Sequence, residues 1–74
     1  MFLTFVFHFS IAMGTVKDVI RFLRDVGVVR GNTVDHGGII HYTESITLLL
    51  GLPPEESIKE LLDYLIKNGY VMVG

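Results

Sequence analysis

Residues 46–71 read ITLLLGLPPEESIKELLDYLIKNGYV, and this stretch decides the fold. Its first part is apolar at helical spacing, which predicts a helix that Thr43 caps and Gly51 ends. The apolar residues on the inner face of this helix are Ile46, Leu49 and Leu50. A glycine directly after a helix permits the sharp turn into a second helix.

The second helix of this stretch begins at Pro53-Pro54, because proline is accepted in a first helical turn, where its missing N–H costs no hydrogen bond. Glutamates at the next two positions suit the positive end of the helix dipole. The apolar residues of its inner face are Ile58, Leu61, Leu62 and Leu65. We expect this helix to end near Asn68-Gly69, and residues 70–73 to form a final strand.

Upstream of this pair, an earlier helix is predicted over residues 16–26. Thr15 is a suitable N-cap, Asp18 completes a short capping box, and Gly27 ends the helix. Its apolar stripe comprises Val16, Val19, Ile20, Leu23 and Val26.

The segment between the helices is rich in turn-forming residues. Residues 28–38 contain three glycines, which predict a loop, with a small hairpin as an alternative. The apolar side chains within residues 39–42 then favour a short strand.

The first thirteen residues hold ten apolar residues and no charged side chain. They are too few for a transmembrane helix, which needs about 20, and no basic residue precedes them as in a signal peptide. Apolar and polar residues alternate, so we predict a strand over residues 2–11. Alternatively, Met13 is the natural initiator. We therefore divide the chain into residues 1–13 and a domain of residues 14–74, and expect a cytoplasmic protein without a membrane segment.

The spacing of apolar residues and glycines in residues 46–71 resembles the helix-turn-helix core of winged-helix domains. The resemblance covers about residues 15–73. It implies an α+β fold, with a three-helix core and a small antiparallel sheet that an N-terminal and a C-terminal strand form. The sequence departs from the family in one important respect, because a wing needs two strands and residues 70–73 supply one. Residues 2–11 could supply the other, or could pair with a second copy of the chain.

The resemblance also implies a function, namely DNA binding by a dimeric transcriptional regulator. A dimer would form through the N-terminal strand or the helix of residues 16–26. In this family the last helix enters the major groove, so the candidate contacts to DNA are Ser57, Lys59 and Lys67. The candidate contacts to phosphates are Lys17, Arg21, Arg24 and Arg30.

Composition argues for a different partner. The 74 residues include six Lys and Arg against eight Asp and Glu, a net charge of −2 that is not typical of nucleic-acid binders. The last helix itself carries four carboxylates: Glu55, Glu56, Glu60 and Asp63. The alternative is therefore a winged-helix module that binds another protein within a larger assembly.

Catalysis and metal binding have little support in the sequence. There is no cysteine and no recognisable nucleophile motif, so we expect neither a disulfide scaffold nor an enzyme, and no cofactor. The metal-capable residues that lie near one another are Asp35, His36, His41 and Glu44. Their spacing matches no recognised metal motif, and we expect them to serve as turn residues and a helix start.

Overall fold

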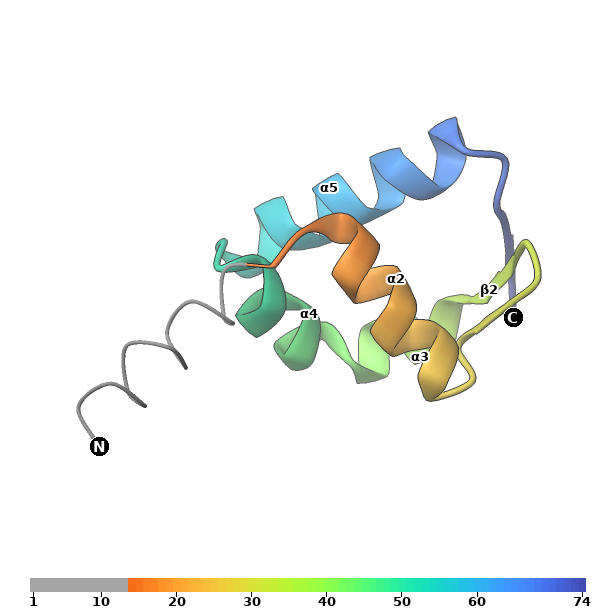
Figure 1. The fold of residues 1–74 in the computed structure, drawn as a ribbon, viewed down its shortest axis with the longest axis horizontal. Helices are drawn as coiled ribbons and strands as arrows, with labels where there is room; N and C mark the ends of the chain where they lie inside the picture. Colours follow the sequence, from red (N-terminus) through yellow and green to blue (C-terminus); the bar gives the residue numbers. More distant parts are fainter. Residues whose placement is uncertain (1–13) are drawn as a thin grey trace.

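The computed structural model describes residues 14–74 (Figure 1). This part of the chain is α+β, with four helices and a small three-stranded mixed sheet. In chain order the elements are α2 (Val16–Asp25), β1 (Val29–Arg30), β2 (Thr33–Asp35), α3 (His36–His41), α4 (Thr43–Leu50), α5 (Pro54–Lys67) and β3 (Val71–Val73). The strand predicted over residues 2–11 lies outside the described residues.

Helix α2 confirms the helix predicted over residues 16–26. The Asp18 carboxylate accepts a hydrogen bond from the Thr15 N–H at 2.9 Å, as a capping box requires. The inner face of α2 is buried against α4 and α5. This face therefore forms part of the core.

The helix pair α4 and α5 also forms where it was predicted. Gly51 ends α4 with a φ of 70°, and its N–H donates to the Thr47 carbonyl at 2.9 Å. That left-handed conformation is the one glycine adopts without strain, and it turns the chain toward Pro54 and α5. Figure 1 shows α2 lying across this pair.

The prediction of a strand over residues 39–42 is wrong, since residues 36–41 form α3, a fourth helix beyond the three that were predicted. The Asp35 carboxylate starts α3 by accepting from the Gly37 N–H at 3.1 Å. Thr43, predicted to cap α4, instead donates its hydroxyl to the Ile39 carbonyl at 3.1 Å, one turn back in α3. The hairpin alternative for residues 28–38 is confirmed, because β1 and β2 pair antiparallel.

The sheet is mixed, whereas an antiparallel sheet was predicted. β3 lies parallel to β2, with Val34 opposite Met72. A parallel neighbour needs a long crossover connection, and helices α3, α4 and α5 supply it. The pairing begins where the Val71 N–H donates to the Asn32 carbonyl at 2.8 Å. The pairing predicted between residues 2–11 and residues 70–73 lies outside the described residues.

Every helix and the hairpin contribute to one apolar core. Its buried residues are Val19, Ile20, Leu23, Val28, Val29, Val34, Ile39, Ile46, Leu61 and Leu65. One face of α5 is thus buried in the core, and its other face lies outside the core. Within residues 14–74, no helix is long and apolar enough to cross a membrane.

Candidate functional site

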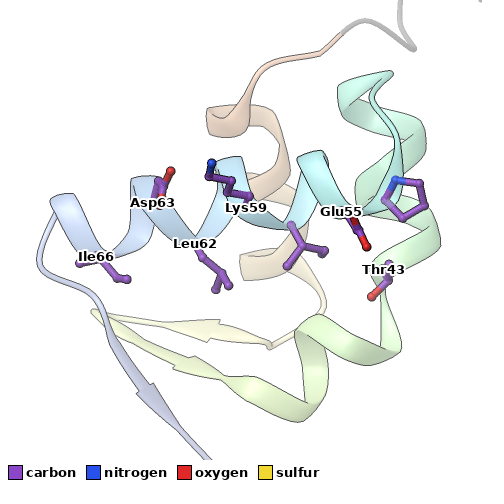
Figure 2. Close-up of a pocket in the computed structure, with 8 residues that line it drawn as sticks. Thr43, Glu55, Lys59, Leu62, Asp63 and Ile66 are labelled. Carbon is purple, nitrogen blue, oxygen red and sulfur yellow. The ribbon is translucent and has the colours of Figure 1, made fainter.

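A shallow apolar groove of about 620 Å³ runs along the outer side of α5 (Figure 2). Most of its lining comes from α5, and the N-terminus of α4 closes one end. The lining residues are Thr43, Pro54, Glu55, Ile58, Lys59, Leu62, Asp63 and Ile66.

The groove exists because α5 carries more apolar surface than the core covers. Leu61 and Leu65 face inward and are fully buried. A second apolar row lies one residue along the helix, where Ile58 and Leu62 are half-buried. Ile66 continues that row and is 70% exposed. In Figure 2, Leu62 and Ile66 point to one side of α5, while Lys59 and Asp63 point to the other.

Charge is unevenly divided between the two halves of the domain. Residues 14–35 carry a net charge of +1 and residues 36–74 carry −3, with histidine neutral. α5 alone has four carboxylates against Lys59 and Lys67. An acidic surface repels nucleic-acid phosphates.

Ser57, which was predicted to contact DNA, is fully buried. Its hydroxyl donates to the Leu52 carbonyl at 3.0 Å, in the turn before α5. The i, i+4 spacing from Ser57 to Leu61 places both side chains on the inner face. The other two residues predicted to contact DNA, Lys59 and Lys67, are exposed on α5.

The four residues predicted to contact phosphates lie on α2 and the hairpin. Lys17 and Arg21 are exposed on α2. Arg24 donates to the Gly31 carbonyl at 3.4 Å and to the Tyr70 hydroxyl at 3.3 Å. These two hydrogen bonds hold the Arg24 side chain beside the hairpin turn.

Arg30 is likewise held at the base of the hairpin, where its Nε donates to the Gly27 carbonyl at 3.2 Å. These contacts fix both arginines beside the turns that flank β1. None of the four phosphate candidates lines the groove on α5.

The cluster considered for metal binding does not assemble into a site. Asp35 caps α3, and the His41 ring packs edge-on against Tyr42 with 4.7 Å between ring centres. Among residues 14–74, no three histidine or carboxylate side chains gather in a group that could hold a metal ion.

Comparison with known proteins gives a relative. Over 62 residues the chain is 66% identical to a protein of Sulfolobus islandicus filamentous virus (isolate Iceland/Hveragerdi), named Uncharacterized protein 69. The aligned region covers 84% of this chain and all of that protein. The chain belongs to the family of that viral protein. No family model matches the sequence, and no solved structure matches it.

The sequence contained a signal for the groove that the predictions did not use. Apolar residues recur at every fourth position from Pro54 to Ile66, a row separate from the buried one. Ile58 and Leu62 were assigned to the inner face with Leu61 and Leu65, and Ile66 was assigned to neither face. Together with Leu61 and Leu65 these residues form one wide apolar stripe, whose outer edge at Ile66 stays exposed.

Proposed function

We propose that this protein is a protein-interaction module that binds its partner on the outer face of α5. The observation that carries the proposal is the exposed Ile66 side chain within an apolar groove on an acidic helix. Contiguous apolar patches that polar residues surround commonly mark protein interaction sites. The charged residues that border the groove resemble the polar rim of a protein interface.

The fold we propose around this surface is winged-helix-like, with α2, α4 and α5 as the three-helix core. Its support is the left-handed turn at Gly51 between two packed helices. In that family α5 would be the helix that enters DNA. Here the hairpin comes before the helix pair and a single strand follows α5. The acidic surface of α5 favours a protein in the place of DNA.

The proposal can be tested with a photo-crosslinking amino acid at position 66. Leu48 on α4 is the matched control, because it is 67% exposed and does not line the groove. We expect covalent protein adducts from position 66 and none above background from position 48. Equal yields at the two positions, or adducts with nucleic acid at position 66, would overturn the proposal.

Duplex DNA remains a second candidate partner, through the basic side of α2 and the hairpin. The supporting observation is that Arg24 and Arg30 are both held beside the hairpin turns by hydrogen bonds to backbone carbonyls. Phosphate contacts make affinity fall steeply with salt. Binding at about 50 mM salt that a K17E/R21E variant abolishes would support this candidate. Absence of binding at that salt concentration would exclude it.

A further inference from the structure

We propose that the partner on this surface is a second copy of the same chain, with the two α5 helices packed antiparallel about a two-fold axis. This inference rests on the proposed function, since it takes the outer face of α5 as the binding surface. It goes beyond that function by naming the partner. Two rows of side chains that run along α5 carry the evidence for it.

Both rows repeat at every fourth residue. The apolar row consists of Pro54, Ile58, Leu62 and Ile66. The charged row beside it consists of Glu55, Lys59, Asp63 and Lys67, and its signs alternate as minus, plus, minus, plus. Rows with this spacing are the ridges that interlock when two helices pack.

The charged row is complementary to itself only when one copy is reversed. In an antiparallel pair, Glu55 lies opposite Lys67 of the second copy, and Lys59 lies opposite Asp63 of the second copy. The two-fold axis generates each pair twice, so all four charges meet an opposite charge. A parallel pair about a two-fold axis would not bring this row against itself with opposite charges matched. This pattern therefore selects a second copy and fixes its direction.

Charge pairs within one helix do not account for the whole pattern. An exposed Glu–Lys pair at i, i+4 contributes only about 0.2–0.5 kcal/mol to a helix. Such pairs also leave the exposed Ile66 side chain unexplained. Antiparallel packing of two α5 helices would cover the apolar row and pair the charged row at once.

The helix of residues 16–26, earlier predicted as a dimer contact, offers less apolar surface for a second copy. The apolar side chains Val19, Ile20 and Leu23 of α2 are buried in the domain's own core. The apolar row of α5 spans thirteen residues, about 18 Å of helix from Pro54 to Ile66. An interface of that length is small, so we expect a dimer that dissociates on dilution.

Analytical ultracentrifugation of the purified full chain tests the inference through a charge exchange. The wild-type protein should pass from monomer to dimer between about 10 μM and 1 mM. The single variants K59E and D63K each place like charges together and should weaken association about tenfold. The double variant K59E/D63K restores opposite charges across the two-fold axis, so its association should return to the wild-type strength.

A variant in the apolar row supplies an independent check. I66D should abolish the dimer, while the matched control L48D, on α4, should leave it unchanged. Circular dichroism verifies that each variant is folded. A wild-type protein that stays monomeric throughout, or a double variant no better than the singles, would overturn the inference.

The two proposals fail in different ways. If purified protein is monomeric but position 66 crosslinks to a different protein, the second copy is wrong and the interaction function stands. If position 66 gives no protein adduct, the interaction function fails. A dimer that forms equally well in I66D shows that α5 is not its interface.

Discussion

Gly38 lies against Val28 so closely that a Cβ on Gly38 would come within 2.6 Å of Val28 Cγ2 and 2.8 Å of Cγ1. Val28 is buried in the core and leads into β1, while Gly38 lies in α3. The absence of a side chain at Gly38 is therefore what lets α3 pack onto the base of the hairpin. A Cβ at position 38 would contact both Val28 methyl groups, so rotation of the valine side chain would not remove the clash.

Replacing Gly38 with alanine should destabilise the domain by about 1–3 kcal/mol, because it overpacks the core. The adjacent G37A variant is the control, since a Cβ there meets only Asp35 Oδ1 at an ordinary 3.6 Å. G37A should be neutral or stabilising by up to about 1 kcal/mol, as expected for alanine in a helix. Urea unfolding followed by circular dichroism measures both.

A double variant separates overpacking from other effects of G38A. V28A removes the methyl groups that the new Cβ would meet. The double variant V28A/G38A should therefore lose less unfolding free energy than the two single variants lose in sum. We expect a favourable coupling of about 0.5–3 kcal/mol. Strict additivity would show that the close contact with Val28 is not the cause.

The contact between Gly38 and Val28 also explains why α3 was not predicted from the sequence. Two adjacent glycines and β-branched isoleucines all disfavour a helix locally, and packing decided the outcome. The Asp35 cap was the one local signal for the start of α3. Helices α2, α4 and α5 were predictable because their caps, glycines and apolar stripes lie within each segment.

Other features depend on contacts between distant residues and could not be predicted locally. The parallel pairing of β3 with β2 depends on how the helices return the chain. Lys59 was expected on the outer face of α5 and lies there, whereas Ser57 was misplaced because a polar residue was assumed to face outward.

Ser57 supplies a second prediction. S57A removes a buried hydrogen bond to the Leu52 carbonyl, so it should cost about 0.5–1.5 kcal/mol of unfolding free energy. Because the side chain is fully buried, S57A should leave any affinity for duplex DNA unchanged. Chemical denaturation and a fluorescence-anisotropy titration test the two parts. A variant of unchanged stability but altered DNA affinity would contradict the buried position of Ser57.

Gly69 supplies a third prediction, which isolates backbone strain. Its φ is +81° and a Cβ there would have nothing within 4 Å, so space is not limiting. G69A should therefore destabilise by about 1–2 kcal/mol through the left-handed backbone alone. G69N should cost less, since asparagine tolerates this conformation better. Equal losses in the two variants, measured by urea unfolding, would argue against strain as the cause.

Asp18 supplies a prediction about pH. The hydrogen bond from the Thr15 backbone N–H, aided by the Thr15 hydroxyl and the charge of Arg21, holds the pKa of the Asp18 carboxyl below its ordinary value of 3.8. The pKa of Asp18 is lower in the folded protein than in the unfolded protein. The ionised carboxylate therefore stabilises the fold at pH values above the unfolded pKa. That stabilisation is lost as the pH falls through the folded pKa.

D18N cannot ionise and lacks this contribution. The difference in unfolding free energy between wild type and D18N should therefore be largest near neutral pH and shrink below about pH 4. T15A is the matched control, because it removes the hydroxyl but keeps the backbone N–H that has the larger effect on the pKa. T15A should retain most of the pH dependence. Stability curves for wild type and D18N that stay parallel from pH 7 to about pH 3 would show that the capping carboxylate does not couple folding to pH.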